Sequence, residues 1–228
     1  MHEDIAERFL DISSKIQAAC EQAQRSNDKI RLVAVSKLQP IDVINEAYAL
    51  GINNFGENYA QELAEKSSEC PKDIIWHFIG PIQSNKVGLI AKHANWVHSI
   101  DREKVARKLN DALETEDKKI HALLQVNIDR EESKSGVLPE EAVDFANKLA
   151  VDYPNLILEG LMFMPKINTS KKAKMDTMRK IVDLQKKLLS KLPGCTHLSL
   201  GTSSDFEEYI LTGSTILRIG ENLLGKRS

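Results

Sequence analysis

The stretch that decides the fold is Arg31-Leu-Val-Ala-Val35, a short apolar run followed at once by Ser36-Lys37. Consecutive apolar residues over this length are typical of a strand that is buried on both faces, as in a parallel sheet. Similar runs recur along the chain, and segments of helical period lie between them. These further runs span residues 53–55, 74–79, 96–100, 120–126, 156–162, 197–200 and 215–219.

The number and order of these runs predict an α/β fold, a (β/α)8 barrel of the TIM type. Eight strands that alternate with helices match the composition of that barrel. An open doubly wound sheet usually has fewer strands and a glycine-rich first turn, which is missing after Val35. An amphipathic segment at about residues 3–25 predicts an extra helix before the first strand.

Length and composition narrow the class of protein. The chain has 228 residues, and no linker or low-complexity tract divides it, so we expect a single domain over residues 1–228. The formal net charge of −2 shows no excess of basic residues, so we expect no nucleic-acid partner. The three cysteines are far apart in the sequence, which indicates reduced thiols. Without a signal peptide or a long apolar run, the chain is expected to be cytoplasmic and to have no contact with membranes.

Lys37 is the sharpest candidate for chemistry because it comes just past a buried strand. In such barrels the binding and catalytic residues lie at the carboxyl ends of the strands. A lysine that forms an imine must be neutral, which at a normal pKa of about 10.4 costs roughly 4–5 kcal/mol at pH 7. Desolvation in the barrel mouth, or a nearby cation such as Arg218, lowers that cost. The alternative is a lysine whose ammonium group stays in water.

Two loops that follow the last two predicted strands have the composition of a phosphate site. They are Gly201-Thr-Ser-Ser-Asp205 and Ile219-Gly-Glu-Asn222. Many barrels bind phosphate at this position through backbone N–H groups. Thr202 and Ser203 add hydroxyl donors, and Gly220 lets the backbone approach a ligand closely.

Ser204 and Arg218 each have a structural alternative. Ser204 begins Ser204-Asp-Phe-Glu207, a capping-box pattern, so Ser203 is the better phosphate ligand. Arg218 lies in the last predicted strand, where a buried arginine needs an acceptor. It is either part of a structural ion pair or a partner for a ring nitrogen. The histidines lack the spacing of metal ligands, so we expect no metal site.

With these residues identified, the chain resembles the pyridoxal phosphate homeostasis protein family, which is itself similar to the N-terminal barrel of alanine racemase. The resemblance rests on residues 32–37, 55–59, 76–86, 133–136, 160–162, 198–201 and 218–220. Their number and order make it specific, although no single segment does. The resemblance implies a barrel of fold type III that holds pyridoxal 5′-phosphate (PLP) as a Schiff base on Lys37.

The resemblance also implies roles for the residues around Lys37. Arg218 would lie by the pyridine nitrogen and keep it unprotonated, which weakens the ring as an electron sink. Ser203 and the backbone around Gly220 would hold the phosphate. The residues implied at the ring are Asn58 and Met162, which would line its pocket, and His77, which would lie beneath it.

Two positions depart from the usual pattern of the family. Glu221 stands where a Thr or Ser usually follows Arg-x-Gly, and its carboxylate next to a phosphate of about −1.5 to −2 charge is unfavourable unless it points away. Thr202 replaces a usual methionine and could supply a compensating hydroxyl. Both changes concern the phosphate seat and leave the assignment of Lys37 intact.

Three functions remain open from the sequence. The resemblance favours a protein of intracellular PLP homeostasis that buffers PLP or delivers it to apo forms of PLP-dependent enzymes. The second is a PLP-dependent racemase or decarboxylase, although we expect neither the second domain nor the second acid/base of alanine racemase. The third is a PLP-free, phosphate-binding isomerase with Lys37 as general base.

Lys134 is a candidate secondary PLP site, because a loop lysine can form a transient imine; an exposed lysine without a role is the alternative.

Overall fold

Each apolar run identified in the sequence forms a strand, and the strands close into a barrel. The structure, a computed structural model, describes residues 4–166, 170–203 and 205–227. Its strands are β1 (Arg31–Val35), β2 (Asn54–Glu57), β3 (Ile75–Phe78), β4 (Trp96–Ile100), β5 (Ile120–Val126), β6 (Leu156–Phe163), β7 (His197–Ser199) and β8 (Ile216–Ile219). They pair in parallel and in sequence order, and β1 pairs with β8 to close the sheet. The predicted (β/α)8 barrel is confirmed.

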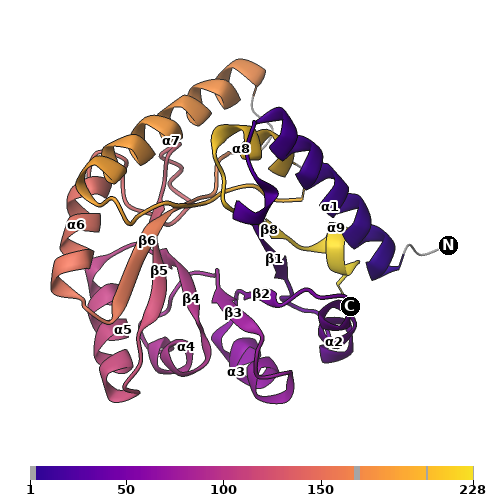
Figure 1. Ribbon diagram of the computed structural model, residues 1–228. Coiled ribbons are helices and arrows are strands. Elements are labelled where there is room, and N and C mark those ends of the chain that lie inside the picture. The colour runs from indigo at the N-terminus through magenta and orange to yellow at the C-terminus, as the bar shows by residue number, and fades with distance from the viewer. Residues whose placement is uncertain (1–3, 167–169, 204, 228) are drawn as a thin grey trace.

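Helices form a layer around the barrel (Figure 1). They are α1 (Ile5–Gln22), α2 (Ile41–Ala49), α3 (Ala60–Glu69), α4 (Val87–His93), α5 (Glu103–Thr115), α6 (Ala142–Asp152), α7 (Lys171–Lys191), α8 (Phe206–Thr212) and α9 (Glu221–Leu224), with a short 3-10 turn, η1 (Asn27–Lys29). The predicted extra helix is α1, whose first N–H groups are capped by the Asp4 carboxylate. This helix packs against α8 and α9, so the two ends of the chain lie together.

The apolar core has two parts, one inside the barrel and one outside it. The inner part is a small cluster of inward-facing strand residues, namely Val33, Trp96, Leu123, Met162 and Ile216. The outer part is much larger and fills the space between the strands and the helices. Because the interior is filled by side chains, ligands can enter only at the ends of the barrel.

Further observations concern the cysteines, the apolar character of the helices and the grouping of metal-binding side chains. Cys20, Cys70 and Cys195 are buried free thiols. In the described part of the chain, no helix has the length and apolar character needed to cross a membrane. The same residues contain no group of three or more side chains arranged to hold a metal ion. Ser204, the predicted helix cap, lies outside the described residues.

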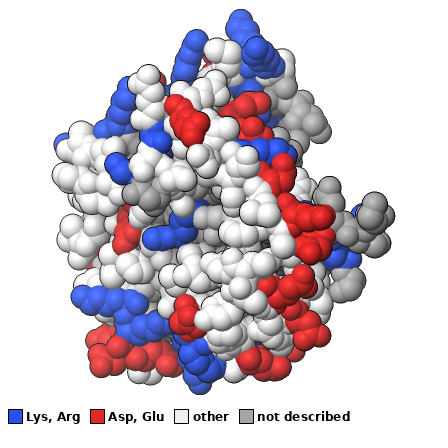
Figure 2. Space-filling view, turned by 45° about the vertical axis from the view of Figure 1, so that its right-hand side comes forward, with Lys and Arg blue, Asp and Glu red and all other residues white. Residues whose placement is uncertain are grey.

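Positive and negative side chains are mixed on the face shown in Figure 2. Basic side chains are visible in a hollow at its centre, and acidic side chains run along one of its edges. This mixture agrees with the small formal net charge of −2.

Candidate functional site

The predicted site residues meet in a cavity of about 510 Å³ at the carboxyl ends of the strands. This volume lies in the range of small-molecule sites, roughly 300–1,000 Å³. The predicted residues that line the cavity are Lys37, Asn58, Lys134, Thr202, Ser203, Arg218 and Gly220. Residues from the two ends of the sequence thus surround one space, as the barrel order requires.

Lys37 follows β1 directly, and a short turn fixes its position. The turn is closed by a hydrogen bond of 3.0 Å from the Gln39 N–H to the Ser36 carbonyl. Leu38 has a positive φ of 59°, a conformation that L-residues rarely adopt and that needs support from the surroundings. That support comes from Glu62, whose carboxylate accepts a hydrogen bond of 2.9 Å from the Leu38 N–H.

A buried ionic network stands directly behind this turn. The Lys66 ammonium group lies 2.9 Å from a carboxylate oxygen of Glu57 and 2.7 Å from one of Glu62. It also donates to the Ser36 carbonyl, at 2.8 Å, while the Ser36 hydroxyl donates to Glu57 at 2.7 Å. Burial raises the pKa of Glu57, and the charge of Lys66 opposes that shift. The network therefore fixes the backbone next to Lys37.

The surroundings of Lys37 favour its neutral amine. Burial lowers the pKa of the Lys37 ammonium group, and the positive charge of Arg227 lowers it further. The carboxylates of Glu221, Glu57 and Glu62 act in the opposite direction. Because the lowering effects prevail, Lys37 is a better nucleophile near neutral pH than an exposed lysine.

Arg218 lies in β8 and forms part of the cavity wall. Its guanidinium donates to the Ser199 hydroxyl and, at 2.9 Å, to the Phe163 carbonyl. Burial lowers the pKa of Arg218 to about 10, so it stays charged at neutral pH. Both acceptors are neutral, which leaves a net positive charge at the cavity and favours the ligand-binding alternative over a structural ion pair.

A chain of hydrogen bonds runs from Arg218 into the barrel interior. Ser199 contacts His98 at 2.9 Å, His98 contacts His77 at 2.9 Å, and His77 contacts the Asn54 side chain at 2.9 Å. Burial lowers the pKa of both His77 and His98 well below the usual range, so both rings are neutral. A neutral chain holds the Ser199 hydroxyl without adding a second charge beside Arg218.

Two predicted residues, His77 and Met162, do not line the cavity. Met162 packs with Val33 and Leu123 in the barrel interior, and His77 stacks on Trp96 at 5.6 Å between ring centroids. Both side chains are fully buried in the barrel interior, with exposed fractions of 0% for His77 and 1% for Met162. The roles expected for Met162 at the wall of the ring pocket and for His77 beneath the ring stay predictions.

The two predicted phosphate loops both reach the cavity and contact each other. The Asn222 side chain donates to the Ser203 carbonyl at 3.0 Å and so ties the two loops together. The Thr202 hydroxyl, expected to compensate for Glu221, donates to the Asp205 carboxylate at 3.2 Å instead. Asp205 also accepts the Thr202 N–H at 2.9 Å, so Thr202 serves the turn and Ser203 is left as the hydroxyl for a ligand.

Lys134 shares the cavity with Lys37. Its ammonium group donates to the carbonyls of Met164, at 3.0 Å, and Pro165, at 3.2 Å, and lies 2.5 Å from the Glu131 carboxylate. These contacts hold the Lys134 side chain against the loop at Met164 and Pro165. The candidate secondary site is thus part of the lining of the same cavity as Lys37.

Sequence reasoning missed two polar residues of the cavity, Gln125 and Arg227. Gln125 had a detectable signal, because it is a polar residue inside the apolar run of β5. It donates to the Ser135 carbonyl at 2.8 Å and holds the loop that carries Lys134. Arg227 had no such signal, since only a turn after α9 brings it to the cavity.

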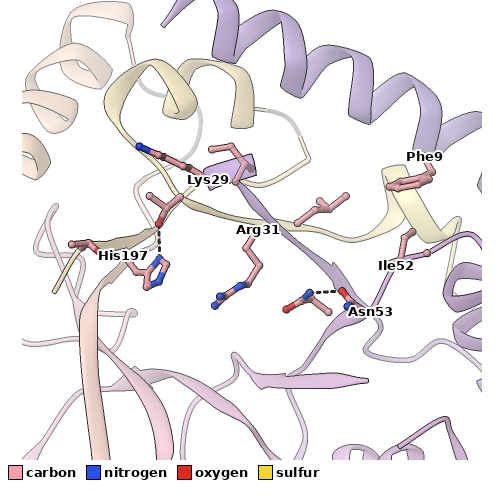
Figure 3. A pocket seen from close by; sticks show the side chains of 12 residues that line it. Phe9, Lys29, Arg31, Ile52, Asn53 and His197 are labelled. Carbon is pink, nitrogen blue, oxygen red and sulfur yellow. Dashed lines mark hydrogen bonds between the residues drawn. The ribbon is translucent and has the colours of Figure 1, made fainter. Parts of the chain in front are cut away.

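A larger cavity, of about 740 Å³, opens at the opposite end of the barrel around the start of β1 (Figure 3). Its lining includes Phe9, Lys29, Arg31, Asn53 and His197 (Figure 3). The Arg31 guanidinium lies over the Trp96 ring, at 4.4 Å from its centroid. None of the predicted site residues lies there, and in such barrels this face serves stability while the other face binds ligands. The smaller cavity is therefore the candidate site.

The chain is similar to known proteins over nearly its whole length. The family model described as alanine racemase, N-terminal domain, matches residues 12–228. A protein of Haemophilus influenzae named pyridoxal phosphate homeostasis protein is 40% identical over 222 residues, which covers 95% of this chain and 93% of the relative. Its counterpart of the same name in Escherichia coli K12 is 39% identical and covers 98% of this chain and 97% of the relative.

Solved structures show the same barrel. PipY of Synechococcus elongatus, solved with PLP bound, has a TM-score of 0.83 at 28% identity and covers 97% of this chain and 100% of that one. An alanine racemase of Clostridium difficile has a TM-score of 0.71 at 13% identity and covers 92% of this chain and 56% of the racemase. The second likeness concerns the fold alone.

Proposed function

Because the chain belongs to the pyridoxal phosphate homeostasis protein family, whose barrel is the alanine racemase N-terminal domain, we propose that it binds PLP and takes part in PLP homeostasis. PLP is held as a Schiff base on Lys37, in a single domain of residues 1–228, and is buffered there or passed on. The observation that carries this proposal is the convergence of Lys37, Arg218 and the loops at Ser203 and Gly220 on one cavity of about 510 Å³.

The donor set of the cavity fits the three polar parts of PLP. Lys37 offers an amine for the aldehyde, Arg218 offers a charged donor for the ring nitrogen, and Ser203 offers a hydroxyl for the phosphate. Gly220 keeps space for that phosphate, because a Cβ there would lie 3.2 Å from the Arg227 guanidinium and 3.6 Å from Val35. Asn58 forms part of the wall between these groups.

The chemistry required of the chain is small. Lys37 would hold PLP through a C=N bond between its amine nitrogen and the aldehyde carbon, with release of one water. PLP, when bound, supplies an electron-withdrawing ring. Arg218 keeps its proton and so disfavours protonation of the ring nitrogen, which weakens that withdrawal. A site built in this way holds the cofactor better than it activates an amino acid.

The tyrosines support a carrier over a racemase. Among the described residues that line the cavity there is no tyrosine to act as a second acid/base. Tyr48 donates to Asp73 at 2.6 Å, and Tyr153 lies 3.3 Å from the Glu103 carboxylate, both away from the cavity. We therefore propose that this protein delivers PLP to apo forms of PLP-dependent enzymes. Lys134 would be the residue that PLP contacts as it leaves the cavity.

Borohydride reduction of the PLP-loaded protein, followed by peptide mapping, tests the proposal. We expect a long-wavelength imine band and an adduct on Lys37, both lost in Lys37→Ala. The Lys134→Ala variant is expected to keep the band and to transfer PLP to an apo-enzyme more slowly. The absence of both band and adduct in the wild-type protein would overturn PLP binding. Exchange of an amino-acid α-hydrogen in deuterated water, lost in Lys37→Ala, would favour the enzyme instead.

A further inference from the structure

The C-terminal segment after α9 folds back over the phosphate end of the cavity. Gly225, with a φ of +89°, turns the chain. The buried Gln39 side chain then donates to the Gly225 carbonyl at 2.9 Å, and Arg8 donates to the Leu223 carbonyl at 2.9 Å. Because contacts from two other parts of the chain fix this path, the position of Arg227 is set by the fold.

This path brings the Arg227 guanidinium against the predicted phosphate seat. One of its nitrogens lies 3.2 Å from the position that a Cβ on Gly220 would take. The other lies 3.4 Å from a carboxylate oxygen of Glu221, the residue that departs from the family pattern. Arg227 lines the same cavity as Lys37, and its charge is the cation that lowers the pKa of Lys37.

The contact between Arg227 and Glu221 is weak. The two side chains are 30% and 52% exposed, and a single contact at 3.4 Å leaves most guanidinium donors without an acceptor on Glu221. A phosphate carries about −1.5 to −2 charge and offers three oxygens, so it is a better partner for a planar guanidinium. An incoming phosphate would therefore draw Arg227 away from Glu221.

We propose that Arg227 is a specificity residue for the phosphate group of PLP and that Glu221 is its counter-ion when no phosphate is present. Arg227 exchanges the Glu221 carboxylate for the phosphate when PLP enters, and this exchange offsets the carboxylate beside the phosphate seat. The pair thereby favours PLP over pyridoxal, the same aldehyde without the phosphate. This inference rests on the proposed function and adds a residue to its binding site.

The test compares the affinities for PLP and pyridoxal, each read from the imine band at the pH plateau of each variant. In Arg227→Gln, PLP binding is expected to weaken about tenfold, as for a lost charge-assisted hydrogen bond, with pyridoxal binding changed less than about twofold. Arg227→Lys keeps the charge but loses the planar pair of N–H donors, so its PLP affinity should lie between those of Arg227→Gln and the wild-type protein. Lys226→Gln, an exposed neighbour on the same segment, is the matched control and should match wild type.

A second experiment changes Glu221. Glu221→Gln should tighten PLP binding in the presence of Arg227, because the carboxylate that competes with the phosphate is removed. Inorganic phosphate should compete with PLP in the wild-type protein and compete less in Arg227→Gln. Thermal unfolding of each variant checks that it is folded.

The outcomes separate this inference from the proposed function. If the wild-type protein forms no imine, both the proposed function and this inference are overturned. If the wild-type protein forms the imine, but Arg227→Gln keeps the wild-type ratio of PLP to pyridoxal affinity, the inference alone is overturned.

Discussion

The ammonium group of Lys66 donates a hydrogen bond of 2.8 Å to the carbonyl oxygen of Ser36. Ser36 immediately precedes Lys37, so this contact ties the strand end that carries the candidate imine lysine to α3. Lys66 reaches this carbonyl with its side chain only 7% exposed, and it pairs there with a Glu57 carboxylate that is fully buried. The lysine that positions the site is therefore an element of stability as well.

Lys66→Met is expected to lower the free energy of unfolding by about 3–5 kcal/mol, because it leaves the buried Glu57 carboxylate without its cation. Urea unfolding measures this loss. The double variant with Glu57→Gln should recover part of it, since the two changes are coupled. Lys104→Met on the exposed side of α5 is the control and should stay within about 0.5 kcal/mol of wild type. A Lys66→Met protein as stable as this control would contradict the assigned role of the network.

His98 and His77 make stability depend on pH. Burial lowers the pKa of each well below the usual range, so below about pH 6.5 the unfolded chain takes up protons that the folded chain refuses. Each histidine therefore removes up to about 1.4 kcal/mol of stability per pH unit as the pH falls from 6.5 towards its folded pKa.

The His98→Gln variant checks that dependence. The variant loses the His98 contacts with Ser199 and His77, so it should be less stable than wild type at pH 7.5. Its slope of stability against pH between 6.5 and 5 should nevertheless be shallower than that of wild type by about one proton. Urea unfolding at several pH values measures both effects, and an unchanged slope would mean that His98 titrates normally.

Gly80→Ala should damage the cavity wall, whereas Gly88→Ala should not. A Cβ on Gly80 would lie 2.2 Å from the Asn58 carbonyl oxygen, so the loop that carries Asn58 must move. A Cβ on Gly88, in α4, meets no atom within 4 Å and should add up to about 1 kcal/mol of helix stability. We expect weaker PLP binding and a lower midpoint of thermal unfolding in Gly80→Ala alone. Equal PLP affinities in the two variants would show that the Asn58 loop is not needed.

Arg218→Lys keeps the charge of Arg218 but loses its planar fork. The Ser199 hydroxyl and the Phe163 carbonyl cannot both keep their present contacts with a single ammonium group. We expect a loss of about 1–3 kcal/mol in the free energy of unfolding and weaker PLP binding. Arg179→Lys, whose side chain is 73% exposed on α7, is the control for the same change of residue type. A variant that equals this control in both measurements would remove Arg218 from the site.

The barrel could be predicted from the sequence because each strand carries its own signal. The runs at 96–100 and 120–126 match β4 and β5 at both ends, since a polar residue stands directly before and directly after each run. Lys37 and Gly220 could be placed as well, because a residue just past a strand must lie at the mouth. The depth of a residue inside a strand was harder to predict. Met162 is one residue from the end of β6, and its side chain turns into the interior layer.

Arg227 could not be predicted for a different reason. Its position depends on the contact of Gln39 with the Gly225 carbonyl, which joins residues 186 positions apart. Contacts at this distance leave no local pattern in the sequence. The same holds for the hydrogen bond chain from Arg218 to Asn54, whose members come from five separate places in the chain.

The pairing of β1 with β8 has a consequence for the way the protein is made. Val33 in β1 stands in register with Arg218 in β8. The strand that precedes Lys37 is therefore synthesised long before the strand with which it pairs. While the ribosome is still translating, Lys37 exists without Arg218, without the backbone at Gly220 and without Arg227. A nascent chain therefore has the Lys37 amine long before it has the other groups of the candidate site. The cavity can therefore take its full shape only after β8 and Arg227 have been synthesised and β8 has paired with β1.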